Sequence, residues 1–285
     1  MSEYRPAISI CIPTFNGEKY IHQTIGSVLN QTFRDFEIVI SDDGSTDRTL
    51  EIVRSFSDNR IVKIESLSRV GAEFNWNNAV NHASGKLVKL LCQDDLLYAD
   101  CLANEVAMMS IPENEGASFC FHQRDLVTPS GKIIKARTRR FLVSDMNLSR
   151  NKLIRQIVRS GSNPIGEPMA VVFRSAAFKN AGQFNGDYVI DLDMWVRLLD
   201  QGKALFIAKH LSAFRISKTS WTSSLTKSQF KIVRAFDLQM TKNNPEIVTQ
   251  NDLRLGLANN ILRTFIRQFA SKVILCVDRF FGTAR

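Results

Sequence analysis

Acidic residues occur in pairs directly after two apolar stretches of this chain. Asp42 and Asp43 follow one stretch, and Asp94 and Asp95 follow the other. Carboxylate oxygens are the ligands that Mg²⁺ and Mn²⁺ prefer, and a cation held in this way can bridge a diphosphate. A carboxylate can also accept a hydrogen bond from a ring N–H of a nucleobase. Either pair could instead stabilise only the turn and helix that follow it, so neither pair is decisive alone.

The stretches around these pairs alternate between strand and helix patterns. Apolar residues predict strands at 7–12, 36–41, 60–65 and 87–92. Between the strands, apolar residues recur at intervals of three and four, which is typical of helices that cover a sheet. This alternation predicts βαβ units, and hence an α/β fold with a mostly parallel sheet flanked by helices.

The predicted sheet would bring distant polar residues together. Ligands of such sheets bind at the carboxyl ends of the strands, which meet at one edge. The polar residues after the first, second and fourth predicted strands are Thr14, Asn16, Asp42, Asp43, Asp94 and Asp95. We therefore expect all of them to lie at a single rim.

The second half of the chain is less regular and contains three further acids of interest. The pattern at 187–199 predicts a helix with Asp191 and Asp193 near its start. A helix turns by about 100° per residue, so these two side chains diverge by about 200° and cannot both serve one acceptor group. Glu167, in the proline- and glycine-containing loop 161–168, either lines a pocket or lies on the surface.

Taken together, these motifs resemble those of glycosyltransferase family 2, whose members have the GT-A fold. The resemblance is carried by ISICIPTFNGEKYIHQTIGSVLNQTFRDFEIVISDDGSTDRTLEIV and, less specifically, by NWNNAVNHASGKLVKLLCQDDLL, GEPMAVVF and AGQFNGDYVIDLDMWVRLLDQG. It implies inverting transfer of a sugar from a nucleotide-diphosphate sugar, with a UDP-sugar favoured, to an acceptor hydroxyl. It also implies Mn²⁺ or Mg²⁺ on the diphosphate, and a place in the synthesis of cell-surface polysaccharide or lipid-linked glycans.

The resemblance assigns a role to each motif. It places along the nucleotide Pro13, Thr14, Asn16, Asp42, Asp43 and Asp94. Within that set Asp43 would bind the base, supported by Asp42, and Asp94 would contact the ribose or the diphosphate. Asp95 would hold the metal.

The same resemblance gives the catalytic base. Asp191 matches the family's base, which takes the proton of the acceptor hydroxyl as that hydroxyl attacks the anomeric carbon. Asp193 is the rival for this role, and Asp191 is favoured. Glu167 and Asp193 would otherwise line the acceptor pocket.

Three positions differ from many relatives. Cys92 stands where the first aspartate of Asp-x-Asp-Asp is usual, which puts the metal geometry in doubt. No histidine follows Phe214–Arg215–Ile216–Ser217, which puts in doubt any ligand to the diphosphate from this loop. Trp76 stands near a common arginine, and its place on an apolar helical face favours packing in the core.

The composition favours an anionic or phosphorylated partner. The net charge is +9, which suits nucleic acid, anionic lipid or phosphorylated substrates. Nucleic acid is disfavoured because the basic residues do not interleave with aromatic residues in one stripe. A basic, amphipathic helical pattern at 254–285 predicts peripheral contact with a membrane, or alternatively packing on the domain or on a second subunit. With no signal peptide, scattered cysteines and no apolar stretch of membrane-spanning length, we expect a cytoplasmic protein, peripheral on the inner membrane face.

The sequence predicts three regions. Residues 1–100 would form the nucleotide-sugar-binding half of a GT-A domain, 101–222 the acceptor-binding and catalytic half, and 223–285 a helical C-terminal extension. Two other functions remain open. A sugar nucleotidyltransferase would need a glycine-rich, basic loop after the first strand, which this chain lacks. A relative that binds sugar nucleotides without turnover would be supported only by Cys92 and the missing histidine.

Overall fold

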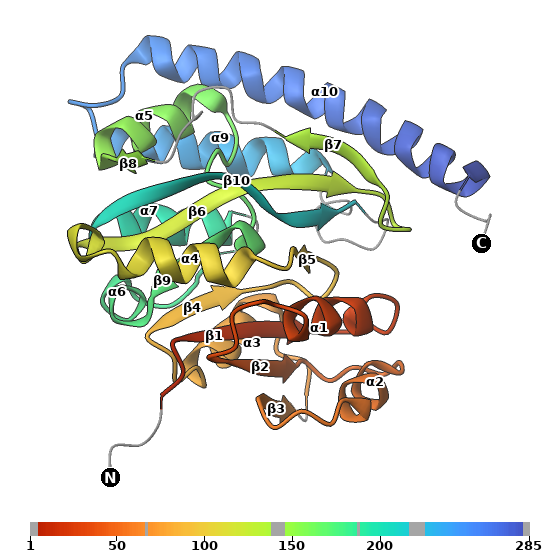
Figure 1. Ribbon diagram of the computed structural model, residues 1–285. Coiled ribbons are helices and arrows are strands. Elements are labelled where there is room, and N and C mark those ends of the chain that lie inside the picture. The colour runs from red at the N-terminus through yellow and green to blue at the C-terminus, as the bar shows by residue number, and fades with distance from the viewer. Residues whose placement is uncertain (1–4, 66–67, 138–145, 187–188, 217–225, 282–285) are drawn as a thin grey trace.

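The computed structural model describes residues 5–65, 68–137, 146–186, 189–216 and 226–281 (Figure 1). Predictions for residues 187–188 and 217–222, and for the side chains of 267–285, lie outside this description. Within the described chain, ten strands form one sheet. The strands are β1 Ile8–Thr14, β2 Phe36–Asp42, β3 Ile61–Glu65, β4 Leu87–Leu90, β5 Leu96–Leu97, β6 Ala117–Val127, β7 Ile133–Arg137, β8 Met146–Leu148, β9 Val171–Arg174 and β10 Lys203–Arg215.

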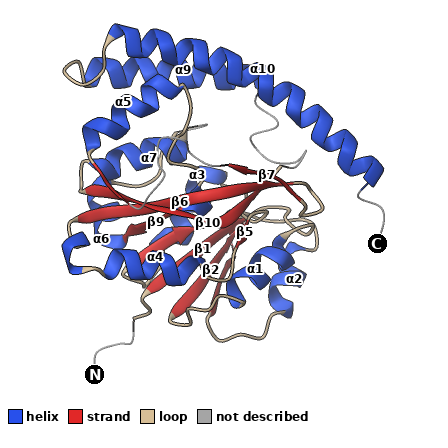
Figure 2. Cartoon of the chain, turned by 45° about the horizontal axis from the view of Figure 1, so that its top comes forward, coloured by secondary structure: helices blue, strands red, loops and turns tan. Residues whose placement is uncertain are grey.

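Helices cover both faces of this sheet (Figure 2). The helices are α1 Ile21–Leu29, α2 Thr49–Ser55, α3 Ala72–Asn81, α4 Cys101–Ser110, α5 Arg150–Ser160, α6 Ser175–Ala181, α7 Ile190–Leu199, α9 Thr226–Asn243 and α10 Gln250–Phe281, with short 3₁₀ helices η1 Pro112–Asn114 and η2 Pro168–Ala170. Among the helices described, none is both long and apolar enough to span a bilayer.

The strand order places the N-terminal half of the sheet beside the C-terminal half. The order is β3-β2-β1-β4-β9-β6-β10-β5, with β7 beside β6 and β8 beside β10. The ladders among β3, β2, β1 and β4 are parallel, as is the ladder between β6 and β10. The other ladders are antiparallel, so the sheet is mixed, and the expected parallel arrangement describes its first four strands. Because a single sheet passes through 1–100 and 101–222, the division of the chain at residue 100 stays a prediction.

The core lies in two layers that follow the alternation of side chains along each strand. On β1, Ile8, Ile10 and Ile12 face the layer beneath α1, α2 and α4, whereas Cys11 faces the opposite layer. Trp76 lies in that opposite layer, is only 9% exposed, and meets Phe184 edge to face with ring centroids 5.5 Å apart. The prediction that Trp76 packs in the core is therefore confirmed.

Helix α10 is attached to the domain at a close crossing with α5. Helix α5 ends at Gly161, which has a left-handed φ of 55°. A Cβ on Gly161 would lie 2.2 Å from the carbonyl oxygen of Gly256 on α10. A Cβ on Gly256 would lie 2.0 Å from the carbonyl oxygen of Val158. Beside this crossing, Arg155 and Arg159 form ion pairs with the buried Asp252 at 3.0 and 3.1 Å. The crossing therefore accepts glycine alone on α10.

We expect Gly256→Ala to lower the free energy of unfolding by about 1–3 kcal/mol, because the added methyl group forces two backbones apart. Gly26→Ala is the control, since a Cβ at Gly26 meets nothing within 4 Å inside helix α1. That change should raise stability by about 0.5–1 kcal/mol. Chemical denaturation of both variants measures the difference, and equal stabilities would contradict the tight crossing.

Candidate active site

The carboxyl ends of β1 and β4 are joined by the side chain of Gln93. Its amide oxygen accepts a hydrogen bond from the backbone N–H of Phe15, and its amide nitrogen donates to the carbonyl oxygen of Phe15, each at 2.9 Å. The hydroxyl of Thr24 on α1 donates to the carbonyl oxygens of Gln93 and Asp95, at 2.8 and 3.0 Å. The loop that carries Asp94 and Asp95 is thus fixed against the loop that follows β1.

The carboxyl ends of β1 and β2 are joined in a similar way. The Thr14 hydroxyl donates to Asp42 Oδ1 at 2.9 Å, and Asp42 also accepts from the backbone N–H and the hydroxyl of Ser45. Asn16 has a left-handed φ of 48°, a conformation that asparagine tolerates, and its Oδ1 accepts from the N–H of Thr46 at 2.8 Å. Pro13 is buried at the end of β1. Thr14, Asn16 and Asp42 therefore lie at the predicted rim, where their side chains connect the two loops.

Asp43 also lies at this rim, with both of its carboxylate oxygens in use. It is 3% exposed, and its oxygens accept hydrogen bonds from the backbone N–H groups of Val70 and Gly71, at 2.6 and 3.0 Å. The loop before α3 is thereby held over the end of β2. A carboxylate oxygen has more than one lone pair, so Asp43 keeps the capacity to accept a further N–H.

Asp94 and Asp95 lie over a buried arginine from the last strand of the sheet. Arg215 is 0% exposed, and its backbone N–H donates to Asp95 Oδ1 at 3.0 Å. Its guanidinium donates to the carbonyl oxygens of Asp94 and Pro129 and to the side chain of Gln23, each at 2.8 Å. The other oxygen of Asp95, Oδ2, is buried and has no hydrogen-bond partner in the described chain.

Four acids crowd around Cys92. Burial raises the pKa of the Cys92 thiol well above its usual value, and the charges of Asp95, Asp94, Asp191 and Glu167 raise it further. Burial and the charge of Asp94 raise the pKa of Asp95 well above its usual range, and burial also raises the pKa of Asp94. Asp94 and Asp95 therefore lie near Asp191 and Glu167, around one thiol. Because the thiol stays neutral, Cys92 adds no further negative charge.

Asp191 enters this acid cluster from the first turn of α7. Its Oδ2 accepts from the side-chain amide of Asn163 at 2.9 Å, and its Oδ1 accepts from the backbone N–H of Leu192 at 2.8 Å. Burial, followed by the charge of Glu167, raises the pKa of Asp191 to about 7. A carboxylate with such a pKa exchanges protons readily near neutral pH.

The loop 161–168 holds the other side of the acid cluster. Asn163 accepts hydrogen bonds from the N–H groups of Ile165 and Gly166, and the indole N–H of Trp195 donates to the carbonyl oxygen of Gly166 at 3.1 Å. Glu167 forms an ion pair with the buried Arg124 of β6. Glu167 is thus half-buried beside the cluster, and 29% of its side chain is exposed.

Asp193 has a different environment from Asp191. Its Oδ2 forms an i,i+4 ion pair with Arg197 at 2.8 Å, and Arg197 also donates to the carbonyl oxygen of Ala181. This contact fastens α7 to the end of α6. The divergence of the two aspartates expected from helical geometry is present, and the role of Asp193 in acceptor binding stays a prediction.

The residues of the rim fit a divalent cation. Asp95 Oδ2 is a buried oxygen without a partner, and Asp94 lies beside it, so hard oxygen ligands are available. Burial raises the pKa values of both carboxyls although Arg215 lowers them, so the described residues compensate these charges only in part. A bound cation would supply the missing compensation.

A second group of metal-ligand types lies elsewhere, between α4 and the sheet. Cys101, Glu105 and His122 are fully buried with their ligand atoms within 4.8 Å of one another. The ammonium group of Lys89 already lies 2.6 Å from Glu105 Oε1, and His122 lies 3.2 Å from the same oxygen. Lys89 therefore takes the position of a cation, and this group is a buried ion-pair network.

Sequence reasoning missed three residues of the site. From the sequence, Arg215 attracts notice only as the neighbour of an absent histidine. Its position at the end of a strand, directly after Phe214, is the signal that could have identified it as a site residue. Asn163, preceding a proline in a loop, carried the weak signal of a side chain that organises a turn. Arg124 carried no signal, because its partner Glu167 is remote in the sequence.

The sequence of this chain matches a known protein family and several known proteins. The family model described as glycosyl transferase family 2 matches residues 9–182. A β-1,3-glucosyltransferase of Campylobacter jejuni, named for GalNAc(5)-diNAcBac-PP-undecaprenol, is 27% identical over 264 residues, covering 91% of this chain and 79% of that protein. The Escherichia coli UDP-Glc:alpha-D-GlcNAc-diphosphoundecaprenol β-1,3-glucosyltransferase WfgD is 26% identical over 226 residues, covering 79% of this chain and 81% of that protein.

Solved structures agree with the fold. Residues 1–349 of S. aureus TarS, in complex with UDP-GlcNAc, superpose with a TM-score of 0.66 at 20% identity, covering 90% of this chain and 72% of that chain. The mannosyltransferase PcManGT of Pyrobaculum calidifontis, in complex with GDP-Man and Mn²⁺, superposes with a TM-score of 0.59 at 17% identity, covering 99% of this chain and 89% of that chain.

The chain has the GT-A fold of these solved structures. Since the family model spans more than half of its length, this chain belongs to glycosyl transferase family 2.

The raised pKa of Asp191 predicts a pH-dependent contribution to stability. Between the unfolded value, ~3.9, and about 7, the folded protein holds a proton that the unfolded chain has lost. The free energy of unfolding therefore falls as pH rises through this interval. Because other carboxyls are also shifted, the measurable quantity is the difference between wild type and Asp191→Asn.

We expect Asp191→Asn and wild type to be similarly stable near pH 4, and the variant to be more stable by a few kcal/mol at pH 8, at ~1.4 kcal/mol per pKa unit. Urea denaturation across this pH range measures the difference. A difference that does not change with pH would mean that Asp191 ionises as freely in the folded protein as in the unfolded chain.

Proposed function

We propose that this chain transfers a sugar, with inversion, from a nucleotide-diphosphate sugar to a hydroxyl of a lipid-linked glycan acceptor. The observation that carries the proposal is the meeting of Asp94, Asp95, Glu167 and Asp191 at the rim where β1, β2 and β4 end. The two glucosyltransferases named above have lipid-diphosphate acceptors in their names, and the TarS complex contains UDP-GlcNAc. A UDP-sugar is therefore the favoured donor.

The chemistry we propose for Asp191 is that of a general base. The ionised carboxylate accepts the proton of the acceptor hydroxyl while the hydroxyl oxygen forms a bond to the anomeric carbon. The bond from that carbon to the diphosphate oxygen breaks on the opposite face, so the configuration inverts and the nucleoside diphosphate leaves. Asn163 and the N–H of Leu192 hold the carboxylate in one orientation during this step.

The nucleotide would lie across the ends of β1 and β2. Asp43 would accept the ring N–H of the base, and Pro13, Thr14, Asn16 and Asp42 would form the wall against which the nucleoside packs. Asp94 would face the ribose or the diphosphate. Asp95, with its buried free oxygen, would hold Mn²⁺ or Mg²⁺, which when bound stabilises negative charge on the departing diphosphate.

The acceptor side of the site would be formed by the loop 161–168 and by α7. Glu167 is fixed by Arg124 beside Asp191 and would contact the acceptor sugar. We also propose that residues 254–285 make peripheral contact with a membrane, which would bring a lipid-linked acceptor to a protein in the cytoplasm. Helix α10 runs across the domain, and its C-terminal end projects on the side toward which β1 and β2 point (Figure 1).

We expect Asp191→Asn to lower kcat by about 10²–10⁴-fold, with donor binding retained, because the amide cannot accept the hydroxyl proton. In the wild type, kcat/KM should rise with pH with an apparent pKa near 7, the value to which burial raises the pKa of Asp191, and this limb should be absent from the residual activity of the variant. Transfer assays with a UDP-sugar panel measure both quantities.

The rival base is tested in the same assays. Asp193→Asn should lose the ion pair with Arg197 while keeping the pH limb. If Asp193→Asn is the inactive variant and Asp191→Asn turns over normally, the roles of these two aspartates are reversed.

We expect Asp95→Asn to weaken Mn²⁺ binding in the presence of UDP by at least roughly 10- to 100-fold, because that loss follows even the removal of a residue that only orients a metal ligand. Titration calorimetry measures this affinity without turnover. Asp100→Asn, which removes the same charge from an exposed residue just before α4, is the matched control. Equal Mn²⁺ affinities for wild type and Asp95→Asn would remove Asp95 as the metal ligand.

A further inference from the structure

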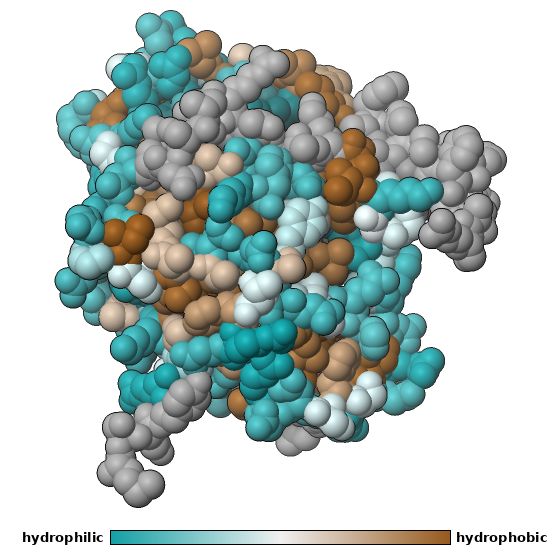
Figure 3. All heavy atoms as spheres, in the orientation of Figure 1, coloured by the Kyte–Doolittle hydropathy of each residue, from teal (hydrophilic) through white to brown (hydrophobic). Residues whose placement is uncertain are grey.

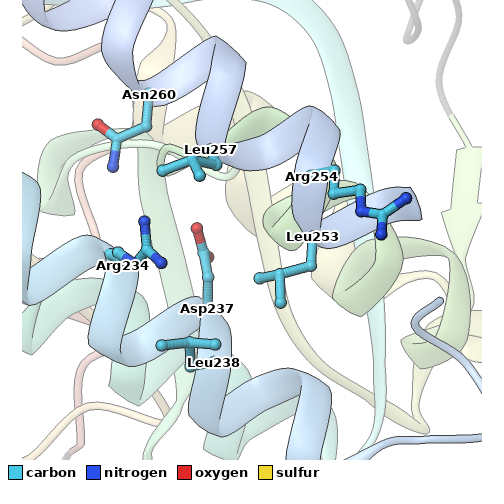
Figure 4. A pocket seen from close by; sticks show the side chains of 7 residues that line it. All are labelled: Arg234, Asp237, Leu238, Leu253, Arg254, Leu257 and Asn260. Atoms are coloured by element: carbon cyan, nitrogen blue, oxygen red, sulfur yellow. The ribbon is translucent and has the colours of Figure 1, made fainter. Parts of the chain in front are cut away.

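Helices α9 and α10 enclose a pocket of about 150 Å³ far from the acid cluster in sequence (Figure 4). Its walls include the apolar residues Leu253 and Leu257, and Asn260 lies on the next turn of α10. Arg234 and Asp237 come from α9. The active site uses none of these residues.

The carboxylate of Asp237 points into this pocket (Figure 4). Asp237 is 3% exposed, and its carboxylate forms no hydrogen bond or ion pair with the described part of the chain. Burial alone raises the pKa of Asp237 to about 7. A buried acid without a donor is unfavourable, and it becomes favourable when a ligand supplies a cation or an N–H group.

Two arginines line the same pocket. Arg234 is one helical turn before Asp237, yet no ion pair joins them, and Arg254 lies on the α10 side. Both arginines are exposed, and neither forms an ion pair within the described residues. The pocket therefore presents a buried negative group beside the exposed Arg234, whereas the guanidinium of Arg254 points away from Asp237 (Figure 4).

An exposed apolar surface on α10 adjoins the pocket. Five residues form it: Leu255, Ile261, Leu262, Phe265 and Ile266, which are 42–67% exposed. At about 100° per residue they fall within one arc of about 140°, which begins beside the pocket at Ile261. Leu238, which is 45% exposed, lines the pocket from α9. Hydrophobic side chains are visible along the top of the molecule, where α10 lies (Figure 3).

We infer that the α9–α10 pocket binds the phosphoethanolamine headgroup of a membrane phospholipid, with the ammonium group at Asp237 and the phosphate at Arg234. The inference rests on the peripheral membrane contact proposed above. The phosphate and ammonium of this headgroup are separated by two carbons, which matches an arginine and an aspartate one helical turn apart. The acyl chains then leave toward the apolar surface of α10.

Other headgroups fit this pocket less well. The trimethylammonium group of phosphocholine has no N–H to donate to Asp237, and phosphoglycerol carries no positive charge. An ammonium that donates to a buried carboxylate makes a charge-assisted hydrogen bond, which is stronger than a neutral one. The pocket should therefore distinguish phosphatidylethanolamine from phosphatidylcholine and phosphatidylglycerol.

Flotation of the full-length protein with vesicles tests the inference. One series contains phosphatidylethanolamine and the other phosphatidylcholine, each with the same small fraction of phosphatidylglycerol. We expect wild type to bind the ethanolamine vesicles roughly tenfold more tightly, as a charged hydrogen bond predicts. Asp237→Asn should lose this preference while still binding both series. Glu246→Gln, which removes an equal charge from an exposed residue between α9 and α10, should keep it.

The contrary outcomes are distinct. Equal binding of wild type to both series, or a preference that persists in Asp237→Asn, overturns the headgroup site and leaves the membrane contact standing. Absence of binding to any vesicle, with a concentration-dependent dimer in sedimentation that Leu262→Gln disrupts, overturns both and makes the apolar surface an interface between two copies. If wild type transfers no sugar but still prefers the phosphatidylethanolamine vesicles, the proposed function is overturned and the headgroup site is supported.

Discussion

The crowding of like charges at the ends of β1, β2 and β4 is the constraint on which the rest of the site depends. Asp94, Asp95, Glu167 and Asp191 are close enough to raise the pKa of Cys92 by their charges. Carboxylates that are this close and this buried repel one another, so the folded protein holds them against an unfavourable free energy. The hydrogen bonds that Gln93, Thr24, Asn163 and the N–H of Arg215 donate hold the surrounding loops in place.

The mixed sheet makes this crowding possible, because its two halves deliver different parts of the site. The parallel strands β1, β2 and β4 bring their loops to one edge, as parallel strands do. Strand β10 then returns from the C-terminal half and places Arg215 beneath the aspartates, with its guanidinium 4.5 Å from the ring centroid of Tyr20. The guanidinium of Arg215 thus supports the aspartate loop through the carbonyl oxygen of Asp94, and one carboxylate oxygen of Asp95 stays available.

The sequence predicted the parts of the structure that are local. Strands β1 to β4 and the residues at their ends follow from patterns within ten or so residues, and helical spacing separated Asp191 from Asp193. The i,i+4 spacing of Asp193 and Arg197 could also have been used, since such pairs interact on helices. Strand β10 and the partners Arg124–Glu167 could not be found in this way, because they depend on contacts between segments that are remote in the sequence. Similarly, the crossing of α5 and α10 depends on Gly161 and Gly256, which have no shared pattern in the sequence.

The acids in the described interior fall into two kinds, which differ in whether an ion pair compensates the charge. Glu105 lies against Lys89 and His122, and these contacts lower its pKa despite complete burial, so its charge is already compensated. Burial raises the pKa values of Asp95, Asp191 and Asp237, and no residue of the described chain forms an ion pair with them as Lys89 does with Glu105. A buried acid whose charge is not compensated lowers the stability of the folded protein. Asparagine, which differs from aspartate by one heavy atom, would avoid this cost. We propose that at each of these three positions a ligand that brings a cation or a proton would remove the unfavourable free energy. The same physical argument therefore joins the catalytic rim to the pocket between α9 and α10.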